Sequence, residues 1–124
     1  MSEELRERIK SVIDTERVTL FMKGTPQFVM CGNSERALQA LRGAGAPVTA
    51  VDVLPDPEIR QELSSRSGWP TIPQVFIGGE LVGGADIVQE LAATGELEQK
   101  LSESLGEDYR DEAQERVVSV LVPA

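Results

Sequence analysis

The order of helix and strand patterns along the chain limits the possible folds more than any other feature of the sequence. Two apolar strand patterns, Val18 to Met22 and Val48 to Val53, are separated by one helix pattern, which predicts a parallel β-α-β unit. Two further strand patterns flank Gly78-Gly79, and a two-residue loop of this kind predicts an antiparallel hairpin. Because a parallel unit is combined with a hairpin, the sheet is not purely parallel, and the sequence predicts a mixed sheet.

Helix patterns precede, separate and follow these strands. One face of a predicted helix from about Glu3 to Glu16 carries four apolar residues: Leu5, Ile9, Val12 and Ile13. Further helices are expected to start at Cys31, at Asp56-Pro57 and after Gly95. A fourth is expected to be capped by Asp86. We therefore expect an α/β protein with a thioredoxin-like fold, in which helices flank a central four-stranded mixed sheet.

The length of 124 residues and the mass of 13.5 kDa fit one folded domain. With 40% hydrophobic residues, a chain of this length buries a core without disulfide bonds. We expect this domain to span residues 1–106. Residues 107–124 are expected to form an appended tail, which is charged as far as Arg116 and apolar from Val117 to Val122.

The charge and the scarcity of sulfur and imidazole exclude several classes of function. Twelve basic and 21 acidic residues give a net charge of -9, so neither nucleic acid nor a membrane is an expected partner. No stretch approaches the ~18 apolar residues of a membrane span, and Met1 to Lys10 lacks a targeting pattern, so we expect a cytoplasmic protein. With no histidine and one cysteine, the chain contains neither a Cys/His zinc set nor a Ser-His-Asp triad. Any metal bound through sulfur must take ligands from outside the chain.

Cys31 is the first candidate for chemistry. It follows a loop with Gly and Pro and precedes a helix, where backbone N–H groups favour a thiolate, and Lys23 adds a positive charge nearby. The alternative is a small buried hydrophobic residue. Ser34 stands where a Cys-x-x-Cys motif has its second thiol, so an adduct at Cys31 must be resolved by an external thiol. Ser34 is alternatively an ordinary polar residue of the first helical turn.

Three more features suggest a binding site. Pro73 begins a strand, and with a cis bond before it the backbone of Ile72 would pair with an extended peptide; a trans bond is the alternative. Residues 83–86 begin a helix whose N–H groups suit a carboxylate, while Asp86 suits an ammonium group; an ordinary turn is the alternative. Lys23 and Arg60 are candidates for a second carboxylate, or are simply solvated. Together these features suit a short peptide thiol with carboxylates at both ends, such as glutathione.

Five stretches of the sequence resemble the monothiol glutaredoxins of the CGFS type. They are Phe21-Met22-Lys23-Gly24-Thr25-Pro26, Cys31-Gly32-Asn33-Ser34, Asp56-Pro57-Glu58-Ile59-Arg60, Trp69-Pro70-Thr71-Ile72-Pro73-Gln74 and Gly83-Gly84-Ala85-Asp86-Ile87-Val88. The resemblance runs from about Ile9 to Leu105. Seven residues separate Lys23 from Cys31, as in that family, whereas dithiol glutaredoxins have a much shorter loop there.

The resemblance implies a thioredoxin fold with Pro73 in the cis form. It implies a glutathione site that uses Lys23, Cys31, Arg60, Ile72, Gly84, Ala85 and Asp86. It also implies a homodimer that bridges one [2Fe-2S] cluster through two Cys31 thiolates and two glutathione thiols. Such a cluster takes four thiolate ligands, of which a dimer with one cysteine per chain supplies half. The implied partners are apo iron-sulfur proteins, and a BolA-type protein is a further candidate.

The sequence departs from the family pattern beside the thiol. Asn33 replaces the phenylalanine of the motif, so a polar amide stands where the family has an aromatic wall, which puts the lifetime of a bound cluster in question. Ala85 stands where many members have a cysteine, so no intramolecular disulfide with Cys31 is possible. Val29 and Met30 replace polar or proline residues ahead of the motif, which alters the surface offered to partners.

The function favoured by these features is an iron-sulfur cluster carrier that passes its cluster to apo-acceptors. The alternative is a glutathione-dependent thiol-disulfide oxidoreductase, in which Cys31 alone reduces glutathionylated proteins. We expect the long loop 24–30 to place glutathione less well for that attack. A third hypothesis is a regulatory adaptor that binds its partner through the acidic surface or through the tail.

Overall fold

The computed structural model describes residues 2–123, apart from the side chain of residue 112. Its helices are α1 (Glu3–Thr15), α2 (Gly32–Gly43), α3 (Pro57–Ser67), α4 (Ala85–Thr94), α5 (Glu96–Leu105) and the 3-10 helix η1 (Tyr109–Glu112). Its strands are β1 (Val18–Met22), β2 (Gly24–Thr25), β3 (Phe28–Val29), β4 (Val48–Asp52), β5 (Gln74–Ile77), β6 (Glu80–Gly83) and β7 (Arg116–Val117). The helix starts predicted at Cys31 and Asp56 are confirmed, because these residues are the N-caps of α2 and α3.

The central sheet has the strand order β6-β5-β1-β4-β7. β1 pairs in parallel with β4 and antiparallel with β5, and β5 and β6 form the hairpin around Gly78-Gly79. The predicted mixed sheet with a thioredoxin-like fold is therefore confirmed. A fifth strand, β7, comes from the tail and extends the sheet by pairing in parallel with β4. It was not predicted, because a strand of two residues is too short to leave an alternating pattern in the sequence.

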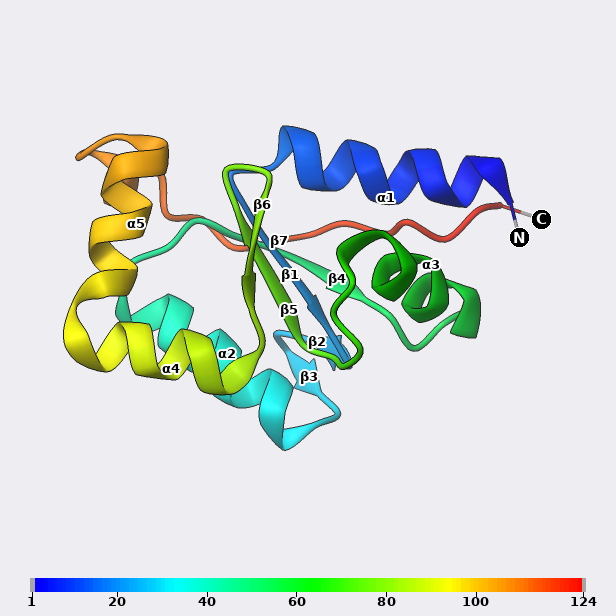
Figure 1. Cartoon of the computed structure of the whole chain (residues 1–124), viewed down its shortest axis with the longest axis horizontal. Coiled ribbons are helices and arrows are strands. Elements are labelled where there is room, and N and C mark those ends of the chain that lie inside the picture. Colours follow the sequence, from blue (N-terminus) through cyan, green and yellow to red (C-terminus); the bar gives the residue numbers. More distant parts are fainter. Residues whose placement is uncertain (1, 124) are drawn as a thin grey trace.

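Helices cover the two faces of the sheet (Figure 1). Val18, Leu20 and Met22 of β1 face one hydrophobic layer, which α2, α4 and α5 complete. Phe21 of the same strand faces the opposite layer under α1 and α3, where its ring lies edge-on to Phe76 with centroids 5.7 Å apart. Because β1 is buried on both faces, its sequence is apolar without alternation.

The chain around α4 and after β1 differs from the prediction. α4 begins at Ala85 with Gly84 as its N-cap, so the predicted cap by Asp86 is wrong. A Cβ atom at residue 84 would lie 3.2 Å from Nε1 of Trp69, so this close packing favours glycine at the N-cap. Asp86 instead lies in the first turn of α4, where its side chain is 88% exposed. The segment between β1 and α2, which was predicted to be a loop with Gly and Pro, contains the short β2-β3 hairpin.

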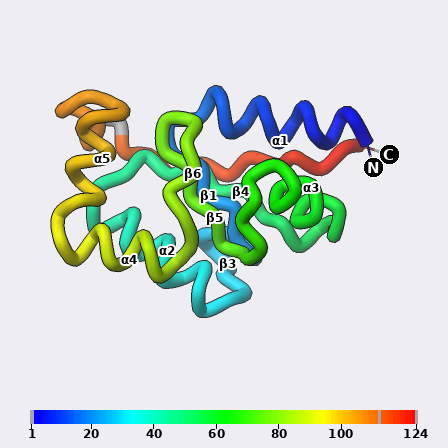
Figure 2. The backbone as a smooth tube through the Cα atoms, in the orientation of Figure 1, coloured from blue at the N-terminus to red at the C-terminus, as the bar shows by residue number. Residues whose placement is uncertain are grey.

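After β7, the rest of the tail runs alongside α1 (Figure 2). The backbone N–H of Val118 donates to the carbonyl of Ala50 at 3.0 Å. Val120 is only 1% exposed and belongs to the hydrophobic layer under α1 and α3. The predicted boundary between a domain and a tail at residue 106 stays a prediction. The apolar part of the tail nevertheless contributes to the hydrophobic core.

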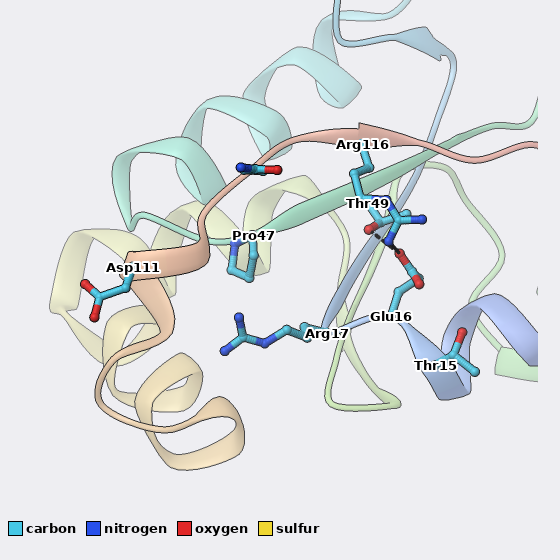
Figure 3. A pocket seen from close by; sticks show the side chains of 8 residues that line it. Thr15, Glu16, Arg17, Pro47, Thr49, Asp111 and Arg116 are labelled. Atoms are coloured by element: carbon cyan, nitrogen blue, oxygen red, sulfur yellow. Dashed lines mark hydrogen bonds and ion pairs between the residues drawn. The ribbon is translucent and has the colours of Figure 1, made fainter.

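Polar contacts also hold the start of the tail. The carboxylate of Glu16 accepts hydrogen bonds from Arg116 at 2.9 Å and from the hydroxyl of Thr49 at 2.7 Å (Figure 3). The Tyr109 hydroxyl donates to the carbonyl of Ala44 at 2.8 Å, and the tyrosine is 3% exposed. The tail is therefore joined to α1, β4 and the end of α2 by side chains as well as by its backbone.

Candidate functional site

Cys31 is half-buried at the N-cap of α2. The backbone N–H of Ser34 is the main cause that lowers the pKa of the Cys31 thiol from its ordinary value, and the N–H of Asn33 and the charge of Lys23 act in the same direction. Partial burial opposes this shift but does not cancel it. The N–H groups of Ser34 and Asn33 are available to the sulfur because they lie in the first turn of α2, where N–H groups have no partner within the helix. Cys31 thus lies at the helix start that the sequence predicts, while the reactivity of its thiol stays a prediction.

Ser34 ties the start of α2 to the end of β1. It is fully buried, and its hydroxyl oxygen accepts a hydrogen bond from the backbone N–H of Lys23 at 3.0 Å. This contact brings the segment that carries Lys23 next to the first turn of α2. Ser34 therefore has a structural role in the first turn, as one of its two interpretations predicted, while it also leaves the site without a second thiol.

The loop between β1 and α2 is held in one conformation by glycine and by backbone hydrogen bonds. Gly24 has a φ of 92°, and a Cβ atom there would lie 2.3 Å from the carbonyl oxygen of Phe28. The N–H of Gly24 donates to Asp52 at 3.0 Å, and the N–H of Met30 donates to the carbonyl of Lys23 at 2.9 Å. The side chains of Phe28 and Met30 remain outside the core, with 73% and 57% of their surface exposed.

A cavity of about 320 Å³ lies between the segment before β5 and the start of α4. Its lining includes Ile72, Gly84, Ala85 and Asp86, four of the predicted site residues. The bond between Ile72 and Pro73 is cis, as the family resemblance implied. The cavity therefore combines the segment that precedes β5 with the N-terminus of a helix, and Asn33 borders it from α2.

Lys23 and Arg60 line a second cavity, of about 480 Å³. Pro70 lines this cavity too, and its carbonyl oxygen accepts a hydrogen bond from Arg60 at 3.5 Å. Residues 69–73 border both cavities. The predicted site residues are thus divided between two cavities on this connector, and Cys31 lines neither of them.

An arginine that the sequence analysis did not single out joins α2 to α4. The guanidinium of Arg36 donates to Asn33 at 2.7 Å, to Asp86 at 2.5 Å and to Gln89 at 2.9 Å. The spacing of Asn33 and Arg36 on one helix is visible in the sequence. The approach of Asp86, 50 residues further along the chain, depends on tertiary packing and leaves no local signal.

The described residues contain neither a ready metal centre nor a membrane-spanning helix. Within residues 2–123, no group of three or more His, Cys, Asp or Glu side chains is placed to hold a metal ion. In the same range, no helix is long and apolar enough to span a bilayer.

The chain is similar to known proteins over most of its length. The family model described as Glutaredoxin matches residues 18–82. Glutaredoxin 4 of Escherichia coli is 43% identical over 106 residues, which are 86% of this chain and 91% of that protein. Monothiol glutaredoxin-S11 of rice is 48% identical over 101 residues, 82% of this chain, but the match spans only 21% of the rice protein. A crystal structure of a buckwheat glutaredoxin-glutathione complex superposes with a TM-score of 0.72 at 25% identity and covers 84% of this chain and 96% of that one.

Proposed function

Because the chain belongs to the glutaredoxin family and is similar to its monothiol members, we propose that it carries a glutathione-ligated [2Fe-2S] cluster as cargo. The cargo is held between two copies of the chain and passed to apo iron-sulfur proteins. The observation that carries this proposal is the place of the one thiol at the N-cap of α2. Asn33, two residues after it, lines one cavity, and Lys23, at the end of the preceding strand, lines the other. Thiolates are the ligands of such clusters, and this position lowers the pKa of the Cys31 thiol.

The number of sulfur ligands determines what else must bind. A [2Fe-2S] cluster takes four thiolates, and each chain offers only Cys31. Two chains supply two of the ligands, so two more must come from small thiols. Ligands that arrive from solution also leave readily, which suits transfer of the cluster to another protein better than its permanent retention.

The two cavities suit the two ends of glutathione. Lys23 and Arg60 in one cavity offer positive charge to the carboxylate of the glycyl end. In the other cavity, the N–H groups at the start of α4 suit the carboxylate of the γ-glutamyl end, and Asp86 suits its ammonium group. Ile72 lines the second of these cavities and is two residues from Pro70, which lines the first, so its backbone suits the peptide part of the ligand. The complex of the buckwheat relative with glutathione supports this choice of ligand.

Thiol-disulfide exchange with glutathione is the second candidate function, because the pKa of the Cys31 thiol is lowered. In this reaction the Cys31 thiolate attacks the glutathione sulfur of a glutathionylated protein, and the protein leaves as a thiolate. A second glutathione thiolate then attacks the adduct on Cys31, which forms glutathione disulfide and restores the Cys31 thiolate. Both steps use one protein thiol, since Ser34 is no second thiol.

The decisive experiment is anaerobic reconstitution with iron, sulfide and glutathione, read by visible absorbance and by molecular mass. We expect the wild-type protein to become coloured and dimeric, and the Cys31→Ser variant to stay colourless and monomeric. Ser65→Ala, an exposed substitution on α3, is the matched control and should behave as the wild type.

The same samples should be assayed for deglutathionylation. A colourless wild-type monomer with rapid turnover would replace the carrier function by the second candidate. Cluster assembly by Cys31→Ser would remove Cys31 from its role in either function.

A further inference from the structure

Arg36 holds one of the polar groups that the proposed ligand would need. Its Nη2 atom donates to Oδ1 of Asp86 at 2.5 Å, its Nη1 atom to Oδ1 of Asn33 at 2.7 Å, and its Nε atom to Oε1 of Gln89 at 2.9 Å. The planar guanidinium therefore uses three acceptors from two helices, a geometry that a lysine side chain would not reproduce. Its side chain is 41% exposed, at the edge of the cavity that Asn33 and Asp86 line.

The contact changes what the start of α4 can recognise. Asp86 is the carboxylate beside this cavity, and one of its oxygens already accepts from a cation. An ammonium group that approaches Asp86 must share this carboxylate with the guanidinium and is repelled by it. A carboxylate at the same place is attracted both by the guanidinium and by the N–H groups of the first turn of α4.

We propose that Arg36 is a specificity-determining residue, which shifts recognition at the start of α4 from the ammonium group toward the carboxylate of a thiol ligand. The inference rests on the proposed function, because the ligand is taken to be a peptide thiol whose γ-glutamyl end carries both groups on one carbon atom. It deepens that function by stating which of the two groups supplies the binding energy at this end.

Asn33 gives this proposal a second support. Its amide oxygen accepts from Arg36 and so fixes the guanidinium between the two helices. A phenylalanine at this position offers no acceptor. The asparagine that departs from the CGFS motif therefore helps to hold Arg36 in its position. Asn33 is thus a positioning residue for Arg36.

The test compares two ligands on two proteins by calorimetric or NMR titration of the apo chain. The ligands are glutathione and its analogue N-glutaryl-cysteinylglycine, which lacks the ammonium group. In the wild type, we expect loss of the ammonium to weaken binding by about twofold or less. In Arg36→Gln this loss should weaken binding about threefold more than in the wild type, the effect of one unit charge about 6 Å away in water.

A third ligand, 4-aminobutanoyl-cysteinylglycine, lacks the carboxylate instead and should show the opposite pattern. Its penalty relative to glutathione should be largest in the wild type and about threefold smaller in Arg36→Gln. Arg36→Lys keeps the charge without the planar group and should give intermediate ratios. Lys10→Gln removes a cation from the exposed face of α1 and should leave all ratios at their wild-type values.

The outcomes separate the two proposals. Equal affinity ratios in the wild type and in Arg36→Gln would overturn the role of Arg36 while leaving glutathione binding intact. No binding of glutathione to the wild type would overturn the proposed ligand, and with it this inference. Since ratios of affinities are compared on each protein, a general loss of stability in Arg36→Gln does not imitate the expected result.

Discussion

Two polar regions lie beyond opposite ends of β1, and they differ in what their polar groups contact. The region after β1 holds Cys31, whose thiol has a lowered pKa, and cavities lined by residues that suit a ligand. The region before β1 holds a cavity of about 500 Å³ at the place where the tail pairs with β4 (Figure 3). There Glu16 is already bound by Arg116 and Thr49, so these groups are used within the protein.

Cavity volume and the chemistry of the lining rank the two regions differently. The larger cavity lies beside the tail, whereas the smaller one lies between a helix N-terminus and the segment that precedes β5. In the first region, side chains satisfy one another and stabilise the fold. In the second, the N–H groups at the start of α2 favour the negatively charged thiolate of Cys31. The two regions should therefore respond differently to substitution, one in stability and the other in chemistry.

The largest expected effect is that of Cys31→Ser on the chemistry. This variant should lose cluster assembly and thiol exchange completely, because no other sulfur nucleophile of the cysteine type is present in the chain. Its free energy of unfolding should change by less than about 1 kcal/mol at neutral pH, since the exchange of sulfur for oxygen removes little apolar surface. Denaturant unfolding measures this free energy. A large loss of stability in Cys31→Ser would contradict the assignment of Cys31 to chemistry rather than to stability.

The next effect in size is that of Gly84→Ala on ligand binding. The new Cβ atom would lie 3.2 Å from Nε1 of Trp69 and 3.3 Å from the carbonyl oxygen of Pro73, so one wall of the cavity must move. We expect glutathione affinity to fall by about tenfold, which corresponds to about 1.4 kcal/mol. Gly43→Ala is the control, because a Cβ atom there meets nothing within 4 Å. Equal affinities of the two variants, measured by titration, would exclude this cavity as the binding site.

On the side of the tail, Val120→Ala is expected to change the stability of the fold and to leave the chemistry of Cys31 unchanged. Val120 is 1% exposed, so the variant loses buried apolar surface and leaves a cavity, which should cost about 2 kcal/mol in the free energy of unfolding. Val117→Ala is the matched control, since Val117 is 51% exposed, and it should cost less than about 0.5 kcal/mol. The alkylation rate of Cys31 should be unchanged in both. Equal stability of the two variants would show that the tail adds nothing to the core.

Much of the fold could be predicted because its signals are local. The apolar run of β1 and the Asp56-Pro57 start of α3 each act within a few residues. The place of Cys31 at a helix start follows from the pattern of loop and helix that surrounds it. These features need no knowledge of the packing between elements.

The parts that could not be predicted depend on contacts between distant segments. Asp86 has the residue type of an N-cap, but the packing of Gly84 against Trp69 set the start of α4 two residues earlier. The bond between Arg36 and Asp86 joins two helices that the sequence does not place beside each other. Likewise, nothing in the apolar end of the tail distinguishes buried Val120 from exposed Val117 before β7 is paired.

The smallest expected effect concerns Lys23 and the pH dependence of the thiol. Among the causes that lower the pKa of Cys31, the charge of Lys23 ranks after the N–H groups of Ser34 and Asn33. In Lys23→Gln the pKa should therefore rise but stay below the ordinary value of 9.0, because the N–H groups remain. Iodoacetamide alkylation across a pH series measures this, and the rate at pH 7 should fall by no more than about threefold.

The same shift makes stability depend on pH in a fixed direction. Since the folded state favours the thiolate, its stabilising effect is complete above the unfolded pKa of 9.0 and is lost as the pH falls through the lowered pKa. As the pH rises from the lowered pKa to the unfolded pKa, the free energy of unfolding of the wild type should therefore increase relative to that of Cys31→Ser. Lys23→Gln should narrow this pH range from its lower side, whereas Val120→Ala should leave it unchanged. If Val120→Ala changed this pH range, the two regions would be energetically coupled, which would contradict their separation.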